Sequence, residues 1–223
     1  MNKSIIIIRK SIAAILLMSA SILCSCDKWL TLEPEDGVTK DDYWTTKEEV
    51  YASLMGCYSA MTSDGMPEKM FLWGELRGET LMPNTVPDRY QLIMDGDITS
   101  NNEVTSWKQF YTVINQCNTV IKYANQAQQY DESFTDQLLD QYQSEAIAIR
   151  SLMYFYLVRT FKDVPYVTDA IISDDQDLQI EKSDGTVILD SLVHSLENIA
   201  PKMAVRFGEN PAVNKGRFTA LGV

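Results

Sequence analysis

The chain is poor in the side chains that catalysis and metal binding most often use. Its 223 residues include a single histidine, His194, so a zinc site built from several histidines is excluded. The sequence also lacks a G-x-G-x-x-G turn, a P-loop and the G-x-S-x-G turn that presents a nucleophilic serine. We therefore predict no metal, no cofactor and no catalytic residue, and we expect that the protein is not an enzyme. A triad that uses His194 and a pair of glycosidase-type carboxylates stay open, because 31 acidic residues offer many pairs.

Basic residues are scarce as well. The chain has 19 lysines and arginines against 31 acidic residues, which gives a net charge of −12. Three of the 19 basic residues and none of the 31 acidic ones precede Cys26, so residues 26–223 carry a net charge of −15. Nucleic-acid phosphates and anionic lipid headgroups both attract basic surfaces. We therefore predict no nucleic-acid partner, and we expect any membrane attachment to use an acyl anchor.

Cysteine is limited to four residues, two of which lie in the first 26 positions. The other two, Cys57 and Cys117, fall on the apolar faces of predicted helices. In an exported protein such a pair forms either a disulfide or two buried thiols. Their apolar surroundings favour two buried thiols.

Residues 1–25 have the organisation of an export signal. A positively charged start is followed by an apolar stretch over residues 11–23, which is shorter than the about 20 apolar residues that a spanning helix needs. The segment ends L-C-S-C, which resembles the lipobox of bacterial lipoproteins. We therefore expect residues 1–25 to be a lipoprotein signal peptide and Cys26 to be lipidated, with palmitate among its acyl chains. The alternative is a plain secretory signal that is cleaved nearby.

Residues 26–43 are polar and contain Pro34 and Gly37, which predicts a lipidated, extended tether. The periodic patterns begin directly after this segment. We expect residues 44–223 to form a helical domain.

The strongest periodic pattern lies in residues 137–161. Its apolar residues recur at three- and four-residue steps, which predicts a helix with a core-facing stripe. The stripe widens over residues 152–158 (LMYFYLV), so this end should be buried on several sides. Pro165 cannot continue a helix and disfavours helical geometry in the residue before it, so we predict that the helix ends near Phe161.

A first helix is predicted to begin at Thr45 or Thr46, because each threonine has a glutamate three residues later, as in a capping box. Its apolar face runs as far as Met61. Residues 70–97 form the least regular part of the chain, since three glycines and two prolines interrupt them.

A long helix is predicted to begin at a second capping box formed by Ser100 and Glu103. Trp107 lies on its apolar stripe, which continues to Ala124. The short link to residues 137–161 predicts that the two long helices form an antiparallel hairpin. A shorter helix, capped by Ser183 or Asp184, is predicted to follow and to end before Pro201.

The central pattern also resembles a known family, the SusD/RagB nutrient-binding outer-membrane lipoproteins of Bacteroidetes. The resemblance is carried by Glu145-Ala146, by Arg150, by the aromatic run at 154–159 and by the motif F-K-D-V-P at 161–165. The motifs L-x-G-x-Y at 54–58, E-L-R at 75–77 and G-R-x-T at 216–219 match further segments of the family. An ordinary buried helix ended by proline is the alternative interpretation of the central pattern.

The resemblance implies an all-α fold in which irregular TPR-like helical hairpins scaffold loop-rich segments. It implies that residues 214–221 begin another helix. It also implies that the chain is a truncated, amino-terminal part of a longer SusD-like protein.

The resemblance further implies a surface-exposed lipoprotein in the outer membrane that faces the exterior. Such a protein binds an oligosaccharide or another nutrient and delivers it to a SusC-type TonB-dependent transporter. Trp73 and Tyr90 are candidates for sugar binding, although a tryptophan placed like Trp73 is more often a core residue under a loop. The alternatives are a TPR-like adaptor lipoprotein that binds protein partners and a surface glycoside hydrolase.

Overall fold

The computed structural model describes residues 43–63, 65–78, 84–173, 175–176, 178–207 and 216–223. Trp44–Val223 form one compact unit. The predicted signal peptide, Cys26 and the tether up to residue 42 lie outside the described residues. Within them the structure consists of helices and one pair of two-residue strands, so the predicted all-α class is confirmed. No described helix combines the length and the apolar character needed to cross a membrane.

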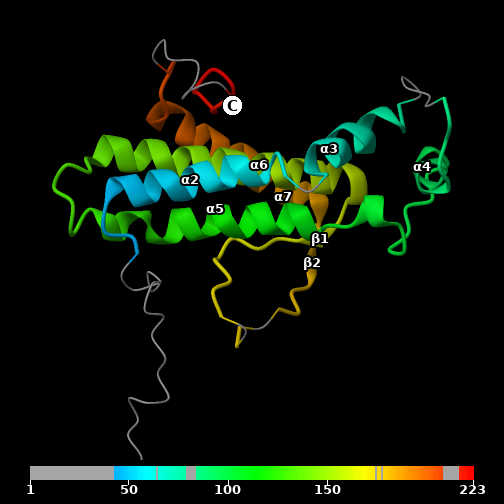
Figure 1. The fold of residues 1–223 in the computed structure, drawn as a ribbon, viewed down its shortest axis with the longest axis horizontal. Coiled ribbons are helices and arrows are strands. Elements are labelled where there is room, and N and C mark those ends of the chain that lie inside the picture. Colours follow the sequence, from blue (N-terminus) through cyan, green and yellow to red (C-terminus); the bar gives the residue numbers. More distant parts are fainter. Residues whose placement is uncertain (1–42, 64, 79–83, 174, 177, 208–215) are drawn as a thin grey trace, which may run out of the picture. The chain divides into compact units, whose positions relative to one another are not determined.

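The bounds of the helices and strands follow the chain from the amino-terminal side. They are α2 (Lys47–Ala60), α3 (Met66–Glu75), α4 (Asp88–Met94), the 3₁₀ turn η2 (Glu103–Thr105), α5 (Lys108–Ala127), α6 (Asp136–Phe161), β1 (Val164–Pro165), β2 (Lys182–Ser183), α7 (Gly185–Ile199) and the 3₁₀ turn η3 (Ala200–Lys202). In Figure 1, α2, α5, α6 and α7 run side by side, and α6 contacts each of the other three.

Helix α6 is the centre of the packing, as the apolar period of its sequence predicts. Its core-facing residues include Ala146, Ile149, Met153 and Leu157, all fully buried. The helix ends at Phe161, because Lys162 has a positive φ of 68° and the chain then enters β1. Helix α5 packs antiparallel to α6 across a short link, which is the predicted helical hairpin.

The start of α2 agrees with its sequence signal. Thr46 is the N-cap, its hydroxyl accepts a hydrogen bond from Glu49 N–H, and the Glu49 side chain accepts one from Thr46 N–H. Asp184 is likewise the N-cap of α7, because its carboxylate accepts hydrogen bonds from Thr186 and Val187 N–H. Both caps satisfy backbone donors that a helix leaves unpaired at its start.

The prediction of a capping box at Ser100 and Glu103 is wrong. Asn102 caps instead, since its side-chain oxygen accepts a hydrogen bond from Val104 N–H, and it opens only the short turn η2. Ser106 then adopts extended backbone angles, so α5 begins at Lys108. Trp107 is the N-cap residue of α5: its carbonyl accepts a hydrogen bond from Tyr111 N–H, and its ring centroid lies 6.3 Å from that of Tyr111.

Two short helices occupy the region that the sequence suggested to be irregular. Gly65 takes the left-handed conformation, with φ of 73°, and ends the turn after α2. Pro67 then sits in the first turn of α3, where a missing N–H costs nothing because that group has no intrahelical partner. Residues 216–223 form turns, so the predicted start of a further helix is absent from this segment.

Asparagine side chains on α5 hold the chain that follows β1. Asn118 donates hydrogen bonds to the carbonyls of Val167 and Asp169 and accepts one from Arg150 on α6. Asn115 exchanges two hydrogen bonds with the backbone of Ile171. These contacts hold residues 167–171 against the hairpin.

A buried polar cluster ties residues 216–218 to the helices. Arg217 forms a two-point ion pair with Glu145, whose closest approach is 2.6 Å, and both side chains are almost fully buried. The Tyr58 hydroxyl donates a hydrogen bond to the same carboxylate at 2.8 Å and accepts one from Phe218 N–H. The cluster therefore links α2, α6 and the last described segment.

Candidate functional site

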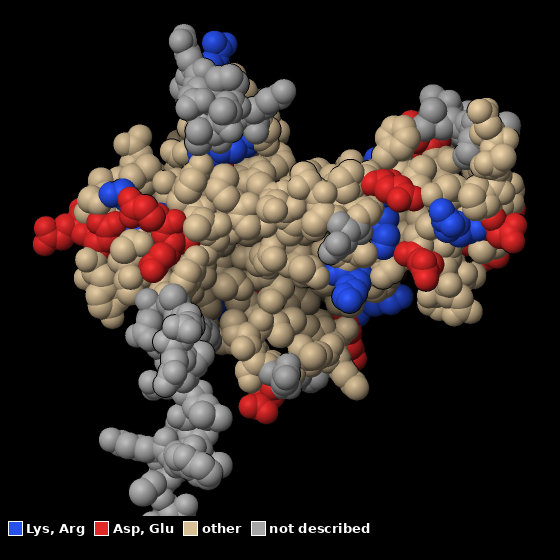
Figure 2. Space-filling model, viewed as in Figure 1, with Lys and Arg blue, Asp and Glu red and all other residues tan. Residues whose placement is uncertain are grey.

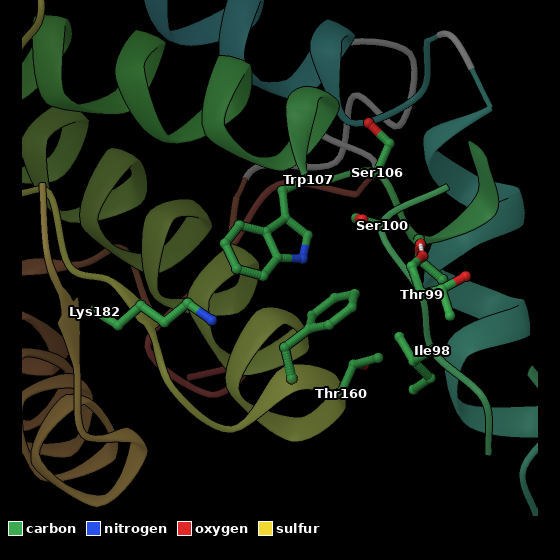
Figure 3. Close-up of a pocket in the computed structure, with 9 residues that line it drawn as sticks. Ile98, Thr99, Ser100, Ser106, Trp107, Thr160 and Lys182 are labelled. Carbon is green, nitrogen blue, oxygen red and sulfur yellow. Dashed lines mark hydrogen bonds between the residues drawn. The ribbon is translucent and has the colours of Figure 1, made fainter. Parts of the chain in front are cut away.

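A hollow of about 650 Å³ lies where the loop before α5, the end of α6 and strand β2 meet (Figure 3). Its volume is within the range of small-molecule sites in proteins. The lining residues are Ile98, Thr99, Ser100, Thr105, Ser106, Trp107, Thr160, Phe161 and Lys182. We call it the Trp107 hollow.

The aromatic part of the hollow is made by Trp107 and Phe161. Their ring centroids are 5.2 Å apart in an edge-on arrangement, and Trp107 remains partly exposed. Lys182 places its ammonium 5.6 Å from the centroid of the Trp107 ring. Figure 3 shows Lys182 approaching the indole from one side and the labelled serines and threonines lying on the other.

The hydroxyl-bearing part of the hollow belongs to a loop that is fixed by its own hydrogen bonds. The buried Asn102 donates to the Arg89 carbonyl at 2.7 Å, in addition to capping η2. The Thr105 hydroxyl contacts the carbonyls of Thr99 and Asn102 at 2.7 and 2.8 Å. The hydroxyls of Ser100 and Ser106 are therefore carried on a well-defined backbone.

Lys69 supports this loop from inside the molecule. Its ammonium donates to the Ser106 carbonyl at 3.1 Å and to the Gln109 side chain at 2.8 Å. Burial lowers the pKa of Lys69, and the charges of Glu68 and Glu103 oppose that effect. Lys69 thus fixes the backbone directly before Trp107.

Thr160 carries an unusual hydroxyl at the end of α6. The oxygen is buried, and among the residues that the structure describes it has no hydrogen-bond partner. An unpaired buried hydroxyl costs about 1–3 kcal/mol, so it calls for an explanation. Thr160 lines the hollow, but this oxygen has almost no accessible surface, so the residue contributes to the wall through its other atoms.

Trp73 and Tyr90, the candidates named from the sequence, do not line the Trp107 hollow. Trp73 is only 2% exposed, stacks on Phe110 at 4.4 Å and donates its N–H to the Val104 carbonyl. This position corresponds to the core alternative and leaves the ring no open face for a sugar. The Trp73 ring also contacts Phe161, with 5.0 Å between the ring centroids, so Trp73 packs behind a residue that lines the hollow.

Tyr90 lies on α4, beside a second and smaller hollow. Its hydroxyl donates a hydrogen bond to Glu68, and the Arg89 guanidinium lies 4.7 Å above its ring. Arg89 and Glu68 line a hollow of about 370 Å³ that Tyr90 itself does not line. Sugar binding by Tyr90 stays a prediction.

The chemistry of the Trp107 hollow is that of binding. An aromatic face beside several hydroxyls suits a sugar ring, which stacks through its C–H groups and hydrogen bonds through its own hydroxyls. The described residues that line the hollow include no histidine and no carboxylate. His194 is exposed on α7, and the described residues contain no cluster of metal-ligating side chains.

Sequence reasoning missed Trp107, Thr160 and Lys182 as site residues. Trp107 fitted the apolar period of the next helix, and only the true start of α5 separates it from that helix. Thr160 and Lys182 reach the hollow through the turn at Lys162 and the pairing of β1 with β2, which no local pattern reveals. The available signal was the run of serine, threonine and asparagine before Trp107.

Comparisons with known proteins agree with this fold. The curated SusD-like protein P38 of Formosa agariphila is 28% identical over 198 residues, which cover 87% of this chain and 38% of that protein. The chain therefore spans well under half the length of this relative.

Solved structures resemble it as well. A SusD superfamily protein from Bacteroides thetaiotaomicron superposes with a TM-score of 0.66 at 22% identity, covering 80% of this chain and 42% of that one. Surface glycan-binding protein A from Bacteroides uniformis gives a TM-score of 0.64 at 18% identity, covering 79% and 39% of the two chains. The TM-scores establish a shared fold, and at such low sequence identities they establish the fold alone.

A family model described as starch-binding associating with outer membrane matches residues 37–194, which is more than half of the chain. The match includes α2 to α6 and most of α7, so it contains the hairpin and the residues of the Trp107 hollow. The chain belongs to the SusD-like family.

Proposed function

We propose that this protein is an outer-membrane lipoprotein that binds an oligosaccharide at the Trp107 hollow, without a chemical step. The observation that carries the proposal is the partly exposed Trp107 indole in a hollow that Ser100 and Ser106 also line. The family description and the glycan-binding neighbour from Bacteroides uniformis support carbohydrate as the ligand class.

The proposal includes the route of the ligand. An exported chain that is lipidated on Cys26 and linked through residues 26–43 would hold residues 44–223 at the exterior face of the outer membrane. There it would pass the oligosaccharide, or another nutrient, to a SusC-type TonB-dependent transporter. The lipobox-like end of residues 1–25 supports the anchor, and membership of the family supports the membrane.

Affinity electrophoresis against a panel of neutral, uronate-containing and sulfated polysaccharides tests the binding. We expect retardation by at least one polymer and no release of product. Trp107→Ala should reduce the affinity about tenfold or more, because loss of one stacking ring costs up to about 1.5 kcal/mol plus its buried area. Tyr130→Ala is the matched control, since it removes an exposed aromatic ring that does not line the hollow.

Two further measurements test the anchor and the route. Replacement of Cys26 by alanine should release the protein from the outer-membrane fraction and abolish labelling by radioactive palmitate. Mild detergent extraction should recover a TonB-dependent barrel together with the protein. Binding to protein partners with no affinity for any glycan would contradict the proposal and favour the adaptor alternative.

A further inference from the structure

Among the described residues that line the Trp107 hollow, Lys182 alone is charged. This part of the lining contains no Asp or Glu, although acidic residues outnumber basic ones by 31 to 19 in the chain. Within the described part of the chain, Lys182 forms no ion pair; the ion pairs there involve Lys47, Arg217 and Lys202. The described lining of the hollow therefore carries one positive charge and no negative one.

The backbone around Lys182 is fixed on both sides. Lys182 pairs with Pro165 and Ser183 with Val164 in the antiparallel strands β1 and β2. Asp184 then caps α7, so its carboxylate is engaged with backbone N–H groups of that helix. The fold thus sets the backbone position of Lys182, and the carboxylate of Asp184 already accepts hydrogen bonds from α7.

The ammonium also occupies the approach to the Trp107 ring. It lies 5.6 Å from the ring centroid, a distance at which a cation is attracted to an aromatic face. A neutral sugar that stacks on this face has to displace the cation and gains no charge interaction in return. A sugar with a carboxylate or a sulfate ester keeps the cation in place and forms a charge-assisted hydrogen bond with it.

We infer that the Trp107 hollow selects an anionic glycan, with Lys182 binding the carboxylate or sulfate of the sugar and Trp107 stacking on its ring. The inference rests on the proposed function and adds the ligand class to it. The net negative charge of the protein does not oppose this choice at close range, because salt at 0.15 M screens charges beyond about 8 Å.

The test compares matched pairs of polymers on the full chain by affinity electrophoresis and calorimetry. One pair is polygalacturonate and its carboxyl-reduced form, and the other is a sulfated galactan and its desulfated form. We expect affinity for the charged member of at least one pair and about tenfold weaker affinity for its neutral counterpart. The pair that binds identifies carboxylate or sulfate as the recognised group.

Variants of Lys182 test whether this residue determines the preference for a charged polymer. Lys182→Ala should lower the affinity for the charged polymer about tenfold, Lys182→Glu should abolish it, and Lys182→Arg should retain most of it. Raising the salt from 50 to 300 mM should weaken binding by the natural protein and have little effect on the alanine variant. Lys122→Ala is the matched control, because Lys122 also lies above an aromatic ring, Tyr123, at 5.7 Å, but outside the hollow.

Two results would overturn the inference. Binding confined to neutral polymers would refute it and leave the proposed function intact. Equal loss of affinity in the Lys182 and Lys122 variants would show that only the overall charge matters. Failure to bind any of the neutral and charged polymers would instead contradict the proposed function itself.

Discussion

Trp73 and Trp107 both contact Phe161, yet they differ in what they contribute. Trp73 is buried and contacts Phe110 and Val104, whereas Trp107 is partly exposed at the hollow. Trp73→Ala should lower the free energy of unfolding by about 3–5 kcal/mol, as for other large core truncations. Trp107→Ala should lower it by about 1 kcal/mol or less and weaken glycan binding. Urea unfolding and calorimetry of both variants separate the two roles, and equal losses of stability would contradict the assignment.

The ion pair between Arg217 and Glu145 is the second residue-scale feature with a clear energetic consequence. Arg217→Met keeps much of the side-chain volume but leaves the Glu145 carboxylate buried without its cation. We expect a loss of about 3–5 kcal/mol in the free energy of unfolding, the usual cost of removing one partner of a buried pair.

Lys202→Met is the matched control for this variant. Lys202 forms an ion pair with Asp140 at 2.8 Å, but their side chains are 51% and 43% exposed. Solvent screens such a pair, so its loss should cost less than about 1 kcal/mol in urea unfolding. A similar cost for the two variants would show that burial does not set the strength of the Arg217 pair.

At the scale of elements, the Thr46 hydroxyl is one of the two side-chain caps at the start of α2. Thr46→Ala removes the hydroxyl that accepts from Glu49 N–H and should lower the free energy of unfolding by about 1 kcal/mol. Thr46→Ser keeps the acceptor and should behave like the natural protein. Thermal unfolding of the three proteins tests this, and a similar loss in the serine variant would refute the role of the cap.

The elements that the sequence predicts well are those with a long period and a cap of their own. Helix α6 has both an extended apolar stripe and a proline beyond its end, and α2 and α7 have caps at Thr46 and Asp184. Helix α3 was not predicted, because Pro67 indicates the end of one helix and the start of the next equally well. The start of α5 was misplaced because Asn102 competes with Ser100 as a cap and produces only one turn.

The site was much less predictable than the helices. Trp107 comes from a loop, Thr160 from the last turn of α6 and Lys182 from a strand more than 20 residues later, and each has an ordinary local context. Only their meeting in space distinguishes them. Trp73 was a candidate for sugar binding because it is a tryptophan near polar residues, but its position is determined by packing against Phe110.

At the scale of the whole molecule, buried tyrosines make stability sensitive to alkali. Burial raises the pKa of Tyr154, Tyr58 and Tyr111 well above the ordinary value of 10.0, and burial likewise raises the pKa of the Cys117 thiol above 9.0. Because the folded values are the higher ones, this contribution to stability is complete below the unfolded pKa values. It is lost as the pH rises through them and toward the folded values.

We therefore expect the free energy of unfolding to fall between pH 9 and pH 11. The loss should be about 1.4 kcal/mol per pH unit for each group that titrates only when unfolded. Urea unfolding at a series of pH values measures the slope. Tyr154→Phe lowers stability at every pH, because Tyr154 exchanges two hydrogen bonds with Val167, but it should also make the slope shallower. An unchanged slope in this variant would contradict the assignment of Tyr154.

Charge is distributed unevenly over the molecule. Figure 2 shows that the middle of the visible face carries few charged side chains, whereas acidic and basic ones gather towards its two ends. Local charge, and not the net charge, is thus what a ligand meets at any one place on the surface. This is why a single lysine suffices to set the preference of a hollow in an acidic protein.

The contact between Phe218 and Tyr58 bears on the order of folding. It joins residues that are 160 positions apart, and the neighbouring Arg217–Glu145 pair spans 72 positions. Contacts that close such long loops carry a large entropic cost before they contribute any energy. We therefore expect the buried polar cluster around Arg217 and Glu145 to form after the rate-limiting step of folding. Weakening the cluster should then accelerate unfolding and leave the rate of folding nearly unchanged.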